Sequence, residues 1–358
     1  MIKDPFRSMV RAEGVLRYRD LPWRRTRDPY GIWISEVMLQ QTQVVRVETR
    51  WPAWLERFPS VDALAAAAPS DVLDEWQGMG YNRRALALHR AAQMVVDEFG
   101  GEFPREAREL MRLPGVGPAT AQGIRSFAFD LPGVYLETNV RTVFLHHFFP
   151  DIEAVPDKEL VPLVEAACPA APGVGAAGAV GAAACMGSNA MGAAGAVACT
   201  GSNATVEAGA FLDRAPAADP LGLTANAPVG GFAGDPGPYA EPEDADDTPR
   251  AWYYALLDYG AYLKKTLPNP SRRSSGYTRQ SKFEGSRRQK RAHIVRMLLA
   301  ARDSDPAGIT LEEAVSGVNK LEAAAGREAV ATDLIASILA DLEREGFCTR
   351  TTDRWLSA

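Results

Sequence analysis

The chain has 358 residues, of which 46% are apolar, so it is long enough for two or three domains with hydrophobic cores. It has no aliphatic run of 18 uncharged residues and no N-terminal signal-peptide core. We therefore expect a cytoplasmic protein rather than a membrane or secreted one. The cysteines show no paired spacing, which gives no support to a disulfide framework or a metal site. They are Cys168, Cys185, Cys199 and Cys348.

Charge is distributed unevenly along the chain, and the formal net charge of −6 hides this. Eleven Lys or Arg residues and one acid, Glu284, lie between Lys264 and Arg296, whereas 241–247 (EPEDADD) carries five acids. A basic stretch of this kind indicates a surface that binds a polyanion. A solvated linker would have the same composition, so both interpretations stay open.

Residues 1–167 have the pattern of consecutive amphipathic helices, with Pro and Gly at the boundaries. The pattern predicts helices over 5–18, 31–45, 47–57, 60–67, 70–76, 82–98, 104–112, 118–129, 138–148 and 157–167. Strand alternation is almost absent from this part of the sequence. We therefore predict an all-α domain.

Residues 168–248 differ in composition, because Ala, Gly, Pro and Ser dominate and ACMGSNA (184–190) is nearly repeated as ACTGSNA (198–204). Such a segment buries too little apolar area to offset its ordering entropy, so we predict a disordered insertion. Helical order resumes at Thr248. The apolar run AWYYALLDYGAYLKK needs a core to pack against, so we expect 249–265 to complete the domain that the insertion interrupts.

After a basic linker (266–286), residues 287–358 are predicted to form a small winged-helix-like domain. Helices over 287–302, 310–317 and 329–345 precede GFCTRTTDRWLSA, which is typical of a short terminal hairpin. Modules of this kind often bind nucleic acid through their third helix. Here the third helix is acidic and poor in Arg, so packing or a protein contact is as well supported.

The most informative stretch is LPWRRTRDPYGIWISEVMLQQTQV (21–44), where one carboxylate, Glu36, lies in an apolar and amide-rich helix that begins near Ile32. One face of this helix consists of Ile32, Ser35, Glu36, Leu39, Gln40 and Gln43. Desolvation should disfavour the charged form of Glu36 and hold it protonated near neutral pH, as a general acid requires. The alternative is an exposed glutamate that the helix dipole favours.

A second signal is LPGVGPATA (113–121), in which Gly115 and Gly117 flank Val116 and a new helix starts at Pro118. The glycines allow a tight turn that exposes backbone N–H groups, and the helix N-terminus adds positive potential. The pattern favours a phosphate clamp of the helix-hairpin-helix kind. An ordinary helix–helix turn is the alternative.

A third signal is VYLETNVRTVFLHHF (134–148), which places Glu137 and Asn139 at the start of a predicted helix. By itself, an acid at this place is best interpreted as a helix cap. Its meaning therefore depends on the other two signals.

Together, these segments resemble the helix-hairpin-helix (HhH-GPD) DNA glycosylases and, among them, the MutY adenine glycosylases. The resemblance covers about 5–167 and 249–263. It rests on SEVMLQQTQV (35–44), LPW (21–23), GMGYNRRA (78–85) and LPGVGPATA. It implies a mainly α, two-lobed fold with the hairpin at 104–129. It also implies a monomer that binds double-stranded DNA, associated with the nucleoid if the source is bacterial.

The resemblance assigns roles that base removal needs, namely extrusion of the base, a wedge that fills the gap and protonation of the leaving group. Glu36 matches the acid that protonates adenine N7, and Glu137 matches the carboxylate that stabilises the sugar cation. Gln41 and Tyr81 match the residues that wedge into the duplex. The other predicted DNA contacts are Gly115, Val116, Gly117, Asn139, Lys282, Arg287 and Arg288, and the base pocket comprises Trp23, Arg24, Leu39, Ala119 and Tyr254.

Three departures from the family bear on the chemistry. The family has aspartate at the place of Glu137. A displacement of its carboxylate by about 1 Å would cost on the order of 100-fold in rate unless the backbone compensates. Ala119 stands where bifunctional relatives such as endonuclease III carry a lysine, so no Schiff base forms there and we predict a monofunctional enzyme. Many members hold a [4Fe–4S] cluster with four cysteines, which are missing between Lys264 and Arg296, so we expect no cofactor or metal.

Two further departures bear on the substrate. Tyr254 stands where MutY proteins place a glutamine or glutamate that reads the adenine amino group. The winged-helix-like domain replaces the long domain that recognises 8-oxoguanine. We expect removal of adenine opposite G or 8-oxoguanine. The alternatives are a glycosylase for another mismatched, alkylated or deaminated base, or a non-catalytic binder of distorted DNA, which the change at Glu137 favours.

Overall fold

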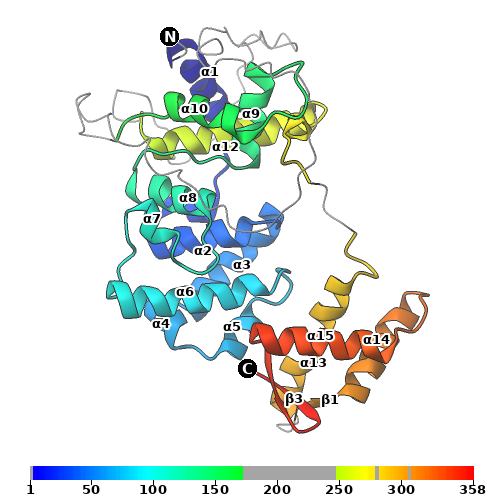
Figure 1. Ribbon diagram of the computed structural model, residues 1–358. Coiled ribbons are helices and arrows are strands. Elements are labelled where there is room, and N and C mark those ends of the chain that lie inside the picture. The colour runs from blue at the N-terminus through cyan, green and yellow to red at the C-terminus, as the bar shows by residue number, and fades with distance from the viewer. Residues whose placement is uncertain (1–2, 172–246, 279–281, 305–307) are drawn as a thin grey trace, which may run out of the picture. The chain divides into compact units, whose positions relative to one another are not determined.

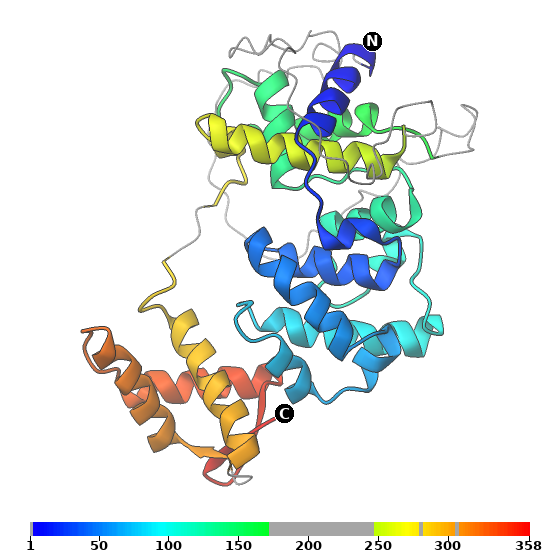
Figure 2. The same cartoon turned by 180° about the vertical axis from the view of Figure 1, so that it is seen from behind.

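The computed structural model describes residues 3–171, 247–278, 282–304 and 308–358, which are mainly helical (Figures 1 and 2). It divides into two compact units. Unit 1 comprises Met1–Asp20 and Arg125–Tyr277, and unit 2 comprises Leu21–Ile124 and Thr278–Ala358. The predicted disordered insertion, 168–248, lies from 172 to 246 outside the described residues.

Unit 1 is a helical cluster in which α12 lies beside both α1 and α9 (Figure 1). Its helices are α1 (Lys3–Leu16), α9 (Thr138–Phe148), α10 (Asp157–Ala167), α12 (Pro249–Thr266) and the 3-10 helix η4 (Pro270–Arg273). Phe6 is fully buried, and its ring lies 5.3 Å from that of Phe144 and 4.9 Å from that of Phe148. The segment 249–265 therefore packs on the core of unit 1, as its apolar composition requires.

The helical part of unit 2 is built around α2. Its elements are η1 (Pro22–Arg25), α2 (Pro29–Leu39), α3 (Val44–Arg57), α4 (Val61–Ala66), α5 (Pro69–Glu75), α6 (Arg83–Phe99) and α7 (Ala107–Leu110), with α8 (Pro118–Phe129) continuing into unit 1. Eight of the eleven residues of α2 are buried, so this helix is surrounded by others. The prediction of helices without strands is confirmed for the described residues between 3 and 167.

Two of the predicted helices in unit 2 are too long. The predicted helix 31–45 is wrong at its end, because α2 stops at Leu39 and α3 starts at Val44. The apolar periodicity continues across this break, but the last carbonyls of α2 are bound by a side chain from α6 instead of by the next turn. The predicted helix 104–112 shortens to Ala107–Leu110, because the residues after it enter a turn with Gly115 at φ +81°.

The C-terminal part of unit 2 combines three helices with a three-stranded antiparallel sheet. Its elements are α13 (Arg287–Ser304), β1 (Ile309–Thr310), α14 (Leu311–Ala324), α15 (Thr332–Glu345), β2 (Cys348–Thr351) and β3 (Arg354–Ser357). The strand order is β1-β3-β2, with Trp355 opposite both Ile309 and Arg350. A capping box at Thr310 and Glu313 starts α14, which extends well beyond the predicted 310–317.

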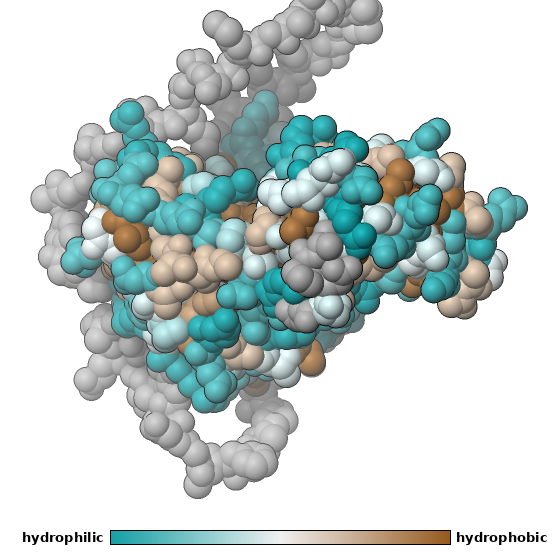
Figure 3. All heavy atoms as spheres, turned by 90° about the horizontal axis from the view of Figure 1, so that it is seen from below, coloured by the Kyte–Doolittle hydropathy of each residue, from teal (hydrophilic) through white to brown (hydrophobic). Residues whose placement is uncertain are grey.

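Each described helix is too short or too polar to cross a bilayer. On the face shown in Figure 3, strongly hydrophobic residues form small separate spots among hydrophilic ones. Where the described residues are visible in this view, their hydrophobic spots are smaller than the large apolar patch typical of a stable docking surface.

Candidate active site and nucleic-acid interface

Glu36 lies in the last turn of α2 and is half-buried. Asp28 caps this helix by accepting the backbone N–H groups of Tyr30 (3.2 Å) and Gly31 (2.9 Å). The Trp51 indole donates to the carbonyl of Gly31 at 2.8 Å, which ties α2 to α3. Glu36 is therefore a carboxyl group of restricted exposure on a rigid helix, and its role as a general acid stays a prediction.

The turn between α2 and α3 presents Gln41, which is exposed and has φ +58°. This left-handed conformation costs a residue with a Cβ atom about 1–2 kcal/mol. The side-chain amide of the preceding residue, Gln40, donates from Nε2 to Thr120 Oγ1 at 3.0 Å and connects this turn to α8. Gln41 is thus held outward at the end of α2 by its surroundings.

The turn before α6 presents Tyr81 in the same conformation, with φ +48°. Gly78 (φ +83°) and Gly80 (φ +70°) allow the chain to turn sharply before it. The Trp76 indole donates to the Gly80 carbonyl at 3.0 Å, and Arg288 Nη1 donates to the Tyr81 hydroxyl at 2.6 Å. Both predicted wedge residues therefore occupy tight, well-anchored turns of unit 2.

A glycine turn joins α7 to α8 at the place of the predicted hairpin. Gly115 is exposed at φ +81°, whereas Val116 is 7% exposed and anchors the turn. A Cβ atom on Gly115 would lie 2.9 Å from the Cβ atom of Ala87, so the hairpin packs directly on α6. Gly117 starts the N-terminal turn of α8 by accepting the N–H of Ala121 at 2.9 Å. The turn has the backbone freedom and the helix N-terminus that an anion-binding site uses.

Glu137 is the N-cap of α9 in unit 1. Its Oε1 atom accepts the backbone N–H groups of Asn139 (2.5 Å) and Val140 (3.0 Å). Both of these capping hydrogen bonds therefore use the same carboxylate oxygen. Burial raises the pKa of Glu137, while these two N–H groups and the charge of Lys264 act in the opposite direction. The side chain is longer than an aspartate and still serves as the cap.

The start of α9 is held by α12 at close range. A Cβ atom on Gly260 would lie 2.2 Å from the carbonyl oxygen of Asn139, so no side chain fits between the two helices there. Lys264, one turn further along α12, donates to Asn139 Oδ1 at 3.3 Å. This contact uses the Asn139 side chain within unit 1, and its predicted DNA contact stays a prediction.

The predicted base-pocket residues fall in both units. In unit 2, Trp23 and Arg24 are 4% and 2% exposed, and Leu39 and Ala119 are half-buried. In unit 1, Tyr254 is 4% exposed and stacks on Phe127, with ring centroids 4.4 Å apart and planes 9° apart. Tyr254 therefore packs in the core of unit 1, and the structure gives no support to stacking of this ring on a base.

The predicted basic contacts differ in their surroundings. Lys282 is exposed, whereas Arg287 donates to Asp341 at 2.6 Å and Arg288 contacts Tyr81. Arg291 likewise pairs with Glu345 at 2.7 Å. The acids of α15 thus neutralise part of the basic helix α13, which composition alone does not reveal.

The residues after α12 do not fit a four-cysteine cluster. No cysteine occurs between Lys264 and Arg296, and a cluster needs thiolate ligands. In unit 1, η4 packs on α9 instead, where Arg273 Nη2 donates to the Leu145 carbonyl at 3.1 Å. Within the described ranges, no group of three or more His, Cys, Asp or Glu side chains could hold a metal ion.

Sequence reasoning missed two residues that hold candidate site elements within their own units, Arg84 in unit 2 and Gly260 in unit 1. Arg84 is the second of two arginines that follow GMGYN (78–82), and an arginine next to a turn is too common in sequences to attract notice. Gly260 lies inside a helix, where a glycine costs stability relative to alanine and so signals a close approach. That second signal was present in the sequence.

Comparisons with known proteins agree with this geometry. Residues 34–162 match the HhH-GPD superfamily of base excision DNA repair proteins. An adenine DNA glycosylase of Mycolicibacterium smegmatis is 46% identical over 126 residues, which are 35% of this chain and 43% of that protein. The human adenine DNA glycosylase is 42% identical over 134 residues, which are 35% of this chain and 24% of that protein. The chain thus spans less than half the length of these relatives.

Solved structures of glycosylases are also similar. A thermostable thymine-DNA glycosylase has a TM-score of 0.42 and 27% identity, covering 45% of this chain and 76% of that one. A non-covalent endonuclease III–DNA complex has a TM-score of 0.35 and 25% identity, and the match covers 38% of this chain and 65% of that one. The matched sequence contains Glu36, the turns of Gln41 and Tyr81, the turn at Gly115 and Glu137. Over this part, the chain is similar to the HhH-GPD superfamily of base excision DNA repair proteins and to the adenine DNA glycosylases.

Proposed function

We propose that this protein is a monofunctional DNA glycosylase of base excision repair, which removes adenine opposite guanine or 8-oxoguanine. The observation that carries the proposal is the content of the matched segment. Residues 34–162 include a half-buried acid on a rigid helix, two anchored turns with exposed or half-exposed side chains, and a glycine hairpin. These are the parts that base extrusion and leaving-group protonation require.

In the proposed reaction, Gln41 and Tyr81 fill the gap that the extruded base leaves, and the hairpin around Gly115 binds phosphate through backbone N–H groups. Glu36 donates its proton to N7 of adenine. The bond between the base and the sugar then breaks, and its electron pair leaves with the base. Glu137 stabilises the positive charge on the sugar, and water adds to the sugar carbon to give an abasic site.

Ala119 limits this chemistry to hydrolysis. A lysine at this place would supply an amine that attacks the sugar and leads to strand cleavage, whereas a methyl group cannot. We therefore propose intact strands with abasic sites as the product. The proposed partner is double-stranded DNA bound by a monomer, without a metal or cluster.

The decisive experiment is single-turnover base release, followed by alkaline cleavage at abasic sites. Duplexes would carry A opposite 8-oxoguanine, A opposite G, T opposite G, U opposite G or an alkylated base. Wild type is compared with Glu36→Gln, and Glu56→Gln, at an exposed position of α3, is the matched control. We expect adenine release that Glu36→Gln abolishes and Glu56→Gln leaves unchanged.

Other outcomes change the proposal in defined ways. Release of a different base, lost in Glu36→Gln, would keep the mechanism and replace the substrate. Strand cleavage without alkali would contradict the monofunctional assignment. Tight binding to mismatched duplexes without any release would refute the enzyme and leave a binder of distorted DNA.

A further inference from the structure

Two turns of unit 2 share an uncommon backbone conformation. Among the described residues, the non-glycine residues with positive φ are Gln41, Tyr81, Asp130, Ala154 and Thr352. A left-handed backbone is unfavourable for a residue with a Cβ atom and persists only when its surroundings hold it. Both residues proposed to wedge into DNA, Gln41 and Tyr81, are in this group.

One guanidinium group binds both of these turns. Arg84 lies in the first turn of α6 and is half-buried. Its Nη1 atom donates to the carbonyls of Val37 (2.7 Å), Met38 (3.1 Å) and Gln40 (2.5 Å). Its Nη2 atom donates to Thr42 Oγ1 (3.0 Å), the Met79 carbonyl (3.0 Å) and the Gly80 carbonyl (3.1 Å).

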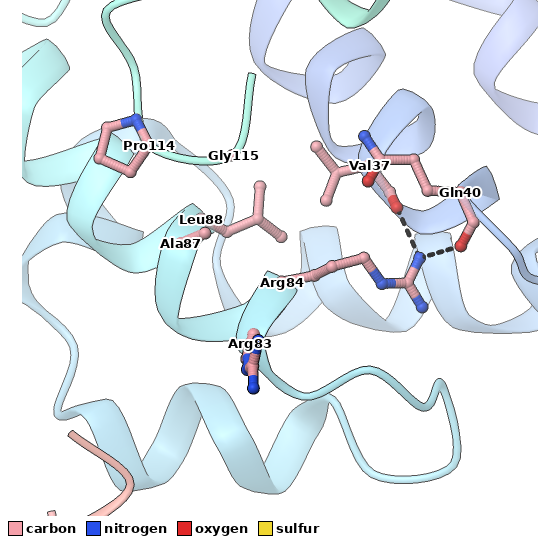
Figure 4. Close-up of a pocket in the computed structure, with 8 residues that line it drawn as sticks. All are labelled: Val37, Gln40, Arg83, Arg84, Ala87, Leu88, Pro114 and Gly115. Carbon is pink, nitrogen blue, oxygen red and sulfur yellow. Dashed lines mark hydrogen bonds between the residues drawn. The ribbon is translucent and has the colours of Figure 1, made fainter. Parts of the chain in front are cut away.

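Two of the bound carbonyls directly precede the two proposed wedge residues. The Gln40 carbonyl belongs to the peptide plane that enters Gln41, and the Gly80 carbonyl belongs to the plane that enters Tyr81. Holding a peptide plane fixes the direction in which the chain enters the next residue, so Arg84 restrains the backbone that leads into both positions. Figure 4 shows the side chain reaching from α6 toward the end of α2.

Arg84 stays positively charged in this environment. Burial lowers its pKa to about 10, which is still far above neutral pH. Its guanidinium carbon lies 5.0 Å from the centre of the Trp76 ring and 5.6 Å from that of Tyr81. A permanent cation therefore faces the carbonyl end of α2, where the helix dipole favours positive charge.

The same helix also seats the hairpin. Gly115 packs against Ala87, which lies one turn after Arg84. Ala87 and Gly115 line a cavity of about 170 Å³, together with Pro114 and Gln40 (Figure 4). Three elements proposed to touch DNA therefore take their positions from the first two turns of α6. Their spacing is set by one helix and one side chain.

We infer that Arg84 is a positioning residue for the DNA wedge: its guanidinium holds the Gln41 turn and the Tyr81 turn in the conformation that inserts into the duplex. This inference rests on the proposed function, because the wedge roles come from it. In this role, Arg84 acts through the two turns that it binds. Its effect is to make insertion of two side chains a single event.

Lysine at this position separates positioning from simple charge. Lys keeps the positive charge at the end of α2, but its single nitrogen has no planar fork and cannot bind two turns in the same way. Arg84→Lys should therefore preserve the charge-dependent part of DNA binding and lose the wedge geometry. Arg90→Lys, at an exposed position of the same helix, is the matched control.

The test uses the full chain and two readouts. The first is the single-turnover rate of base release, and the second is the fluorescence of 2-aminopurine placed beside the target base, which reports unstacking. The fluorescence is measured in the Glu36→Gln background, so the base stays attached. For Arg84→Lys we expect a rate lowered by about 10- to 100-fold and a lost fluorescence increase. Binding to undamaged duplex should keep its affinity and its salt dependence.

The outcomes separate the two proposals. If wild type releases a base and unstacks 2-aminopurine, and Arg84→Lys does both equally well, the positioning role is refuted while the glycosylase stands. If Arg84→Lys and Arg90→Lys lose activity together, positioning by Arg84 is also refuted. If wild type neither releases nor unstacks a base, both proposals fall.

A second variant covers the case in which Arg84→Lys does not fold. Thr42→Val keeps the approximate size of the side chain and removes the hydroxyl that accepts from Arg84 Nη2 at 3.0 Å and donates to the Gln40 carbonyl at 3.3 Å. We expect it to fold with the thermal stability of wild type and to lose part of the 2-aminopurine signal. A folded Thr42→Val with the full signal would refute the positioning role on the Gln41 side.

Discussion

Gly260→Ala tests how closely the position of Glu137 depends on helix packing. The new Cβ atom would lie 2.2 Å from the carbonyl oxygen of Asn139 and 2.7 Å from its carbonyl carbon, whereas ordinary contacts begin near 3.4 Å. These neighbours are backbone atoms of α9, which cannot rotate away. The two helices must therefore separate by about 1 Å.

The magnitude follows from two opposing effects. Replacing a glycine inside a helix by alanine stabilises the helix by about 0.5–1 kcal/mol. Overpacking costs about 1–3 kcal/mol, and a clash with backbone belongs at the upper end. We expect a net loss of about 2 kcal/mol, which lowers Tm by about 5 °C. Because Glu137 caps the helix that moves, the single-turnover rate should fall by up to about 100-fold.

Gly14→Ala is the matched control. Its Cβ atom would lie 2.4 Å from the Cβ atom of Ala255, so α1 and α12 clash to a similar degree about 7 Å along α12 from Gly260. Thermal unfolding by circular dichroism and base release well below Tm are measured for both variants. We expect both to lose stability and Gly260→Ala alone to lose rate. A Gly260→Ala protein as stable and as active as wild type would refute the reasoning.

Three further predictions concern charge. Burial lowers the pKa of His147 to about 3, so between pH 6.5 and 3 the unfolded chain binds a proton that the folded chain does not. Stability should fall by about 1.4 kcal/mol per pH unit below 6.5, and His147→Gln should lack this component in denaturant titrations at pH 7 and 5. Glu137→Asp should keep the cap of α9, so we expect the single-turnover rate to change while Tm stays near that of wild type. A changed Tm with an unchanged rate would contradict a catalytic role. Lys282→Ala should reduce the salt slope of DNA binding by about 0.9, and Arg287→Ala, which is paired with Asp341, should leave it unchanged. A salt slope reduced by Arg287→Ala and unchanged by Lys282→Ala would contradict the proposed DNA contact of Lys282.

The sequence by itself determined most of the helices and the chemical content of the candidate site. The predicted helices 118–129, 138–148 and 157–167 agree with α8, α9 and α10, because apolar periodicity and start signals are local properties. The motifs around Glu36 and Gly115 also indicated the family whose model matches residues 34–162. A helix forms its backbone hydrogen bonds within itself, so its presence can be predicted from its own sequence, although its ends depend on its neighbours.

The tertiary structure decided how these parts are used. It ended α2 at Leu39, because Arg84, from far along the chain, binds the last carbonyls of that helix. It buried Tyr254 against Phe127 and paired Arg287 with Asp341, two contacts that no local pattern encodes. The physical reason is the same in each case. Periodicity shows that a face is apolar or charged, but the partner of that face depends on which helices meet when the chain folds.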